Sequence, residues 1–205
     1  MARKIKKRKL EKKILILGEG TSEQSYFIEM KESEHLSYTI KPELPKNSNY
    51  DTIFKKAENE AEYYLKVFCL IDLDYIIRDG LYSEYNNYKQ KLQRENKNVQ
   101  IFENYPCLET WFAFHYAYFS REFASCKDLI NEFLNIKNRL MDYKKGASSR
   151  KYYNQLKPYQ NEAIIRAERT FQNRSNGIAD NQYRMKDCQV AFTEVYRIIW
   201  ELLDA

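Results

Sequence analysis

Three acidic residues stand where two short apolar runs end: Glu19, Asp72 and Asp74. Glu19 comes after Ile14–Leu17, and the two aspartates come after Val67–Ile71. Uninterrupted apolar runs of this length are typical of strands buried on both faces of a parallel sheet. Carboxylates gathered from separate strands are the ligands that Mg²⁺ or Mn²⁺ prefers. Such an ion can polarise a phosphate and activate water. The spacing therefore predicts a metal site for phosphoryl chemistry.

The local sequence gives each of these acids a second interpretation. Gly18 and Gly20 bracket Glu19, which would let a phosphate or another backbone approach closely. Glu19 could then hold the metal or act as a general acid or base. Asp72 and Asp74 are two residues apart on one expected strand, so both side chains would point to one side, roughly 7 Å apart. The alternative is that either aspartate only caps the loop after the strand.

An apolar helix expected over residues 107–119 carries two further candidates. Glu109 lies near its start, where a carboxylate meets the positive end of the helix dipole. It could supply another metal-directed or basic oxygen, or only stabilise the first turn. His115 shares a helix face with Trp111, four residues earlier. It could protonate a leaving group or contact a phosphate, or be a hydrogen-bonded core residue.

Basic residues gather at two places that could contact a polyanion. Residues 1–13 hold eight lysines and arginines and one glutamate, which is +7 in a chain of net charge +5, so the rest carries −2. This tail is either a phosphate-binding arm or a disordered, solubilising terminus. The second group lies beside Tyr152 and Tyr153: Lys144, Lys145, Arg150 and Lys151. Cations interleaved with stackable rings suit single-stranded nucleic acid, although a solvated loop between helices has the same composition.

Alternating strands and helices position the acids. Strands are expected at 13–17, 38–43, 66–72 and 99–102, and helices at 22–33, 51–65 and 81–95. This order predicts an α/β, Rossmann-like fold with a mostly parallel four-stranded sheet, helices on its faces and right-handed crossovers. Parallel pairing of the first and third strands would place Glu19 opposite the aspartates. The spacing of Thr21 and Gln24 predicts a capping box at the first helix.

Past Pro106 the pattern becomes helical throughout. Helices are expected at 107–119, 121–140, 150–172 and 186–203. We therefore divide the chain into a basic tail (1–12), an α/β domain (13–105) and a helical subdomain packed on it (106–205).

The remaining composition restricts the class of protein. The cysteines are far apart and form no C-x-x-C pair, which argues against a zinc cluster: Cys69, Cys107, Cys126 and Cys188. Reduced thiols are the simplest expectation. No apolar run reaches the roughly 18 residues of a membrane span, and the basic start does not lead into a signal peptide. We expect a cytoplasmic protein without a membrane partner.

Two motifs resemble a known family. The run Glu19–Glu23, followed by Tyr26 and Phe27, resembles the E-G-x-T-E opening of RloB-like proteins, with Ser22 in place of the threonine. The segment Pro106–Trp111 resembles their N-P-C-F-E-x-W segment, and the following histidine is His115. The chain departs from that pattern at Tyr105 and Leu108. Looser resemblances are at 143–146 and 163–167.

The resemblance implies a TOPRIM fold, whose signature is a glutamate after the first strand and a later D-x-D. It implies a Mg²⁺- or Mn²⁺-dependent nuclease of restriction or phage-defence loci, often encoded beside an ATPase. A related TOPRIM effector cuts transfer RNA, so RNA and DNA both remain candidate substrates, and a homo-oligomer remains open. By the motif, Glu109 belongs to the active region. The main alternative is a non-enzymatic adaptor that binds nucleic acid or the ATPase. Nucleotidyl transfer is disfavoured because no dedicated nucleotide-binding motif is present.

Overall fold

The computed structural model describes residues 13–36, 39–43, 49–140, 143–145, 152–175 and 190–203. The predicted basic tail, residues 1–12, lies outside this range, and so do Arg150 and Lys151. Their expected contacts with a polyanion therefore stay predictions.

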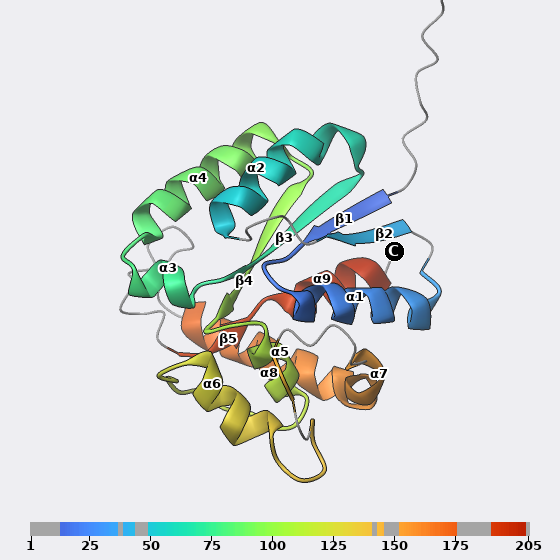
Figure 1. Cartoon of the computed structure of the whole chain (residues 1–205), viewed down its shortest axis with the longest axis vertical. Coiled ribbons are helices and arrows are strands. Elements are labelled where there is room, and N and C mark those ends of the chain that lie inside the picture. The colour runs from blue at the N-terminus through green and yellow to red at the C-terminus, as the bar shows by residue number, and fades with distance from the viewer. Residues whose placement is uncertain are drawn as a thin grey trace, which may run out of the picture.

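The centre of the molecule is a mixed sheet with strand order β2-β1-β3-β4-β5 (Figure 1). The strands are β1 (Lys13–Leu17), β2 (Thr39–Glu43), β3 (Lys66–Asp72), β4 (Val99–Tyr105) and β5 (Phe192–Thr193). The first four pair in parallel, which confirms the predicted strands and their α/β order. The expected strand number is wrong, because β5 joins β4 in antiparallel pairing. Two residues within a helical pattern carry no strand periodicity from which β5 could have been predicted.

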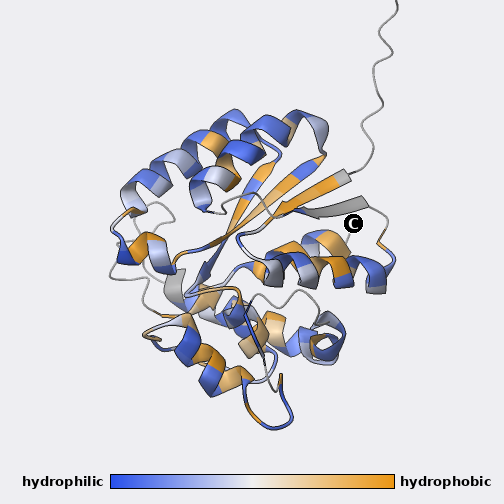
Figure 2. Cartoon of the chain, viewed as in Figure 1, coloured by the Kyte–Doolittle hydropathy of each residue, from blue (hydrophilic) through white to orange (hydrophobic). Residues whose placement is uncertain are grey.

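Strand pairing brings the ends of β1 and β3 together. Leu17 pairs with Cys69, so the residues after β1 lie beside the last residues of β3. Alternate side chains of these strands enter two different cores. Ile14 and Ile16 face one core, while Leu15 and Leu17 face the other. Burial on both faces is the reason that β1 and β3 are apolar between their end residues, as Figure 2 shows.

Helices cover both faces of the sheet (Figure 1). They are α1 (Thr21–Glu34), α2 (Tyr50–Glu60), α3 (Asp74–Arg78), α4 (Tyr82–Glu95), α5 (Glu109–Phe114), α6 (Cys126–Leu129), α7 (Tyr153–Leu156), α8 (Gln160–Ser175) and α9 (Val195–Leu203). Short helical turns occupy Ala61–Tyr63, Ile130–Leu134 and Lys157–Tyr159. Side chains of α2 and α4 fill the core on one face, and those of α1, α5, α8 and α9 fill the core on the other. None of the described helices is long and apolar enough to cross a membrane.

The region after Pro106 differs most from its prediction. The helix expected over 107–119 spans only Glu109–Phe114, and most of 121–140 is not helical. These segments are apolar because they fill the core beneath the sheet, where Trp111 and Phe112 are fully buried with Leu70 of β3. Tertiary burial therefore accounts for their composition without a continuous helix. The division of the chain at residue 105 stays a prediction.

Candidate active site: an acidic cluster at the ends of β1 and β3

Glu19 leaves the end of β1 and reaches the end of β3. Its Oε1 accepts a hydrogen bond from the backbone N–H of Asp72, with an O–N distance of 3.3 Å. This contact joins residues 53 apart in the sequence, and it exists because β1 and β3 are neighbours in the sheet. The structure therefore brings Glu19 and Asp72 together, as the strand order led us to expect.

Asp72 is held from the opposite side by the last residues of β4 and β5. Its side chain is buried, and Oδ1 accepts a hydrogen bond from Asn104 Nδ2 at 3.3 Å. Asn104 Oδ1 in turn accepts a hydrogen bond of 2.6 Å from Thr193 Oγ1. Our prediction missed both supporting residues, because it ended β4 at Phe102 and did not include β5.

Asp74 is not on the strand, so the expected spacing on one side of β3 is wrong. The chain turns at Leu73, and Asp74 is the first residue of α3. Its Oδ1 accepts a hydrogen bond of 2.6 Å from the backbone N–H of Tyr75. In this structure the Asp74 side chain therefore accepts a backbone N–H of the first turn of α3. Its role as a metal ligand stays a prediction.

Glu23 is a buried acid that our list of candidates omitted. A Cβ atom added at Gly18 would lie 2.8 Å from Glu23 Cβ, and one added at Gly20 would lie 2.8 Å from Glu23 Oε2. The two glycines thus make room for this side chain. The predicted capping box is wrong, because the N-cap of α1 is Gly20 and it makes no side-chain capping bond. The available signal was the position of Glu23 within the family-like opening motif.

Glu109 enters the same region from the first turn of α5. It is 0% exposed, and its Oε1 accepts a hydrogen bond of 2.6 Å from Tyr143 Oη. Lys145 Nζ lies 3.5 Å from Glu109 Oε2 and 3.6 Å from Asp72 Oδ2. The ammonium of Lys145 is thus in contact with two acids, although its side chain is 48% exposed. Lys144 is exposed as well.

We call these five side chains the acidic cluster: Glu19, Glu23, Asp72, Glu109 and Lys145. Burial, followed by the charge of Asp72, raises the pKa of Glu19 well above its usual value. Burial also raises the pKa of Asp72. Burial and then the neighbouring Glu109 raise the pKa of Glu23 to about 7. Burial lowers the pKa of Lys145, but the charges of Asp72, Glu109, Glu23 and Asp74 together raise it by more. Three buried carboxyl groups and the half-buried Glu19 therefore share one ammonium, and they favour protons or a further cation.

The donor set of the cluster fits Mg²⁺ or Mn²⁺, because carboxylate oxygens are the preferred ligands of both. In the described part of the chain, the ligand atoms of the predicted triad, Glu19, Asp72 and Asp74, do not all lie within 4.8 Å of one another. That does not argue against Mg²⁺, which usually takes one or two carboxylates and keeps several waters. Glu19 and Asp72 are the two acids that the hydrogen bond between the Glu19 side chain and the Asp72 backbone makes neighbours.

Comparison with known proteins places the chain in a family. The model of the RloB-like protein family matches residues 14–202. The chain belongs to the RloB-like protein family. No curated protein and no solved structure matches the chain. The matched range of this RloB-like protein contains all five members of the acidic cluster.

His115 of the RloB-like protein lies in the core. Its Nδ1 is 2.9 Å from the backbone oxygen of Trp111, and the two rings meet edge to face. Burial lowers the pKa of His115 to about 4, so the imidazole is neutral at physiological pH. No hydrogen bond or ion pair within the described part of the chain joins His115 to the acidic cluster. This environment favours the core interpretation, and its catalytic role stays a prediction.

The expectation of reduced thiols is wrong for two cysteines. Cys107 and Cys126 form a disulfide across a sequence separation of 19, because the chain after α5 folds back until the start of α6 meets the start of α5. Cys69 is free and buried in β3, as predicted, and Cys188 lies outside the described residues. The disulfide lies next to a carboxylate: the ligand atoms of Cys107, Glu109 and Cys126 all lie within 4.8 Å of one another. Disulfide sulfurs are not thiolates, so this group is not a soft-metal site in the oxidised form.

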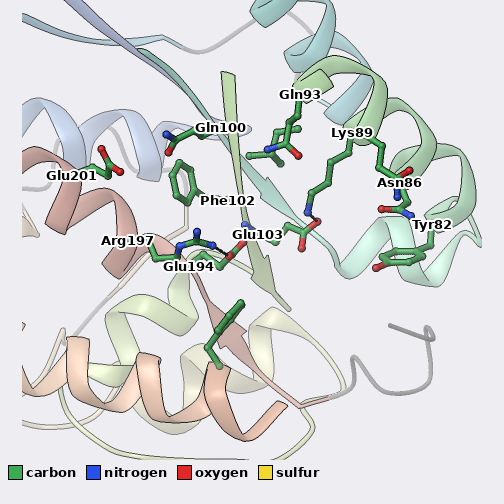
Figure 3. Close-up of a pocket in the computed structure, with 13 residues that line it drawn as sticks. Tyr82, Asn86, Lys89, Gln93, Gln100, Phe102, Glu103, Glu194, Arg197 and Glu201 are labelled. Carbon is green, nitrogen blue, oxygen red and sulfur yellow. Dashed lines mark hydrogen bonds and ion pairs between the residues drawn. The ribbon is translucent and has the colours of Figure 1, made fainter. Parts of the chain in front are cut away.

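A pocket of about 410 Å³ lies between α4, β4 and α9. Figure 3 shows Lys89 turned toward Glu103 and Arg197 turned toward Glu194. Lys89 Nζ is 2.6 Å from Glu103 Oε1, and Arg197 is 2.6 Å from Glu194 Oε1. Glu194 also accepts a hydrogen bond from the backbone N–H of Glu103. This network secures β4 one residue before Asn104, which holds Asp72.

Proposed function

We propose that this RloB-like protein is a Mg²⁺- or Mn²⁺-dependent TOPRIM-type nuclease that cleaves RNA, such as transfer RNA, or DNA in defence against phage or foreign DNA. The observation that carries the proposal is the hydrogen bond of Glu19 with the backbone of Asp72 at the carboxyl ends of two parallel strands, beside the buried acids Glu23 and Glu109. Membership of the RloB-like family supports it. An ATPase partner, self-association and a cytoplasmic location remain predictions.

Four members of the acidic cluster, together with Asp74 and Lys144, have roles in this proposal. Glu19 and Asp72 hold the ion, and Asp74 and Glu109 supply further oxygens around it. When bound, the ion polarises the scissile phosphate and lowers the pKa of water. In the alternative role, Glu19 acts as a general acid, because its raised pKa favours the protonated form of its carboxyl group and a protonated carboxyl group can pass a proton to a leaving oxygen. Lys145 and the exposed Lys144 attract the phosphate backbone.

The test is cleavage by purified protein. RNA, single-stranded DNA and duplex DNA are each incubated with Mn²⁺, and at least one is expected to be cut. Asp72→Asn should abolish the cutting, because it removes a negative charge at the centre of the cluster. Asp79→Asn is the matched control, since Asp79 is an exposed acid at the end of α3. Cutting that survives in Asp72→Asn would reject this site.

One observation favours the adaptor as the second candidate. Lys145 already places a positive charge between Asp72 and Glu109, as expected of a scaffold that needs no metal. Titration with Mg²⁺ or Mn²⁺ separates the two functions. Thermal stabilisation that disappears in the double variant Asp72→Asn/Asp74→Asn supports the nuclease, and no shift at any concentration supports the adaptor.

A further inference from the structure

The disulfide lies directly against the acidic cluster. Cys107 comes two residues before Glu109, and Cys126 is the first residue of α6. The Sγ atom of Cys126 is 3.3 Å from Glu109 Oε2 and 3.6 Å from Lys145 Nζ. A sulfur in a disulfide has no hydrogen to donate, so it packs against the Glu109 carboxylate without satisfying it. One covalent bond thus contacts two members of the cluster.

The disulfide also opposes an electrostatic force. Glu109 is buried, and its charge acts against those of Glu23 and Asp72. Like charges in a buried site repel strongly because little water screens them. Tyr143 and Lys145 offset part of this repulsion. The disulfide also counters the repulsion, because it is a covalent cross-link between the start of α5, where Glu109 lies, and the start of α6.

We propose that Cys107 and Cys126 form a thiol–disulfide switch that sets the position of Glu109 and Lys145 in the acidic cluster. In the oxidised form, the bond holds the cluster closed. Reduction by a thiol reductant transfers two electrons: the S–S bond breaks, each cysteine gains a proton, and two reductant thiols become a disulfide. Glu109 then moves away from the other acids. Disulfides in reducing compartments are typically transient and redox-sensing, which suits this position.

The first test is a Mn²⁺ titration of thermal stability, and it rests on the proposed metal-dependent function. The oxidised protein is compared with protein reduced by a phosphine. Reduction should raise the Mn²⁺ midpoint about fivefold or more, the lower end of coupling between linked sites. The double variant Cys107→Ser/Cys126→Ser should have the Mn²⁺ midpoint of the reduced protein, and the reductant should not change it. Cys69→Ala is the control, because Cys69 is a buried free thiol elsewhere, and it should keep the redox response. An equal midpoint in both redox forms of the wild type would overturn the switch.

The second test needs no metal. Lys145 is acetylated with an amine-reactive reagent in both redox forms. Its extent of labelling is quantified by mass spectrometry against that of its neighbour Lys144. The ion pairs with Asp72 and Glu109 protect Lys145 in the oxidised form, so reduction should raise the ratio of Lys145 to Lys144 labelling severalfold. If Mn²⁺ binds neither redox form, the nuclease proposal fails, and the ratio of Lys145 to Lys144 labelling alone then tests the thiol–disulfide switch. An unchanged ratio would overturn it.

Discussion

Neutralising Glu23 should stabilise the protein at alkaline pH. The pKa of Glu23 is about 7 in the folded protein against an ordinary 4.5. Between these values the folded protein holds a proton that the unfolded chain has released, so the free energy of unfolding falls as pH rises through this window. Each pKa unit corresponds to about 1.36 kcal/mol, so ionised Glu23 costs about 3 kcal/mol above pH 7.

Glu23→Gln replaces the acid with a neutral side chain of the same length, and it keeps the packing against Gly18 and Gly20. The variant should exceed the free energy of unfolding of the wild type by less than about 1 kcal/mol near pH 5 and by about 3 kcal/mol at pH 8. For a chain of this length, that difference corresponds to a rise in melting temperature of roughly 6–12 °C. Urea denaturation at pH 5, 6, 7 and 8 without divalent ions measures the effect.

The control is Glu162→Gln, because Glu162 is an exposed acid in the first turn of α8. It should leave the pH dependence of stability unchanged. If Glu23→Gln follows the wild-type curve at every pH, then ionised Glu23 is not destabilising. The acidic cluster would then be stable without a further cation.

Two further predictions concern neighbouring side chains. Tyr143→Phe removes the hydroxyl that donates to buried Glu109 and should lower the free energy of unfolding by about 1.5–3 kcal/mol. Tyr159→Phe, at an exposed tyrosine, should have little effect, and equal losses in both would contradict the assigned bond. The pKa of about 4 for His115 predicts that its imidazole NMR signals stay constant from pH 8 to pH 5. A midpoint near 6.5 would show that His115 is not in the desolvated site described.

The part of the candidate site that could be predicted from sequence depends on local pattern and strand order. The apolar runs before Glu19 and Asp72 identified β1 and β3, because a strand buried on both faces has no polar alternation. Parallel strands end at the same edge of a sheet, so the two acids were expected to meet. Asp74 was misplaced because β3 turns into α3 immediately after Asp72, and the residue pattern does not mark that turn.

Local residue patterns alone indicated the α/β order, the carboxyl-end position of Glu19 and Asp72, and the family. Only the tertiary structure showed that Glu23 and Lys145 complete the acidic cluster and that Cys107 meets Cys126. Lys145 lies 73 residues from Asp72 in the numbering of the chain, and no periodicity links them. Local patterns record which side of an element is buried. The contacts between distant elements depend on how the loops return the chain, and that is decided by packing of the whole core.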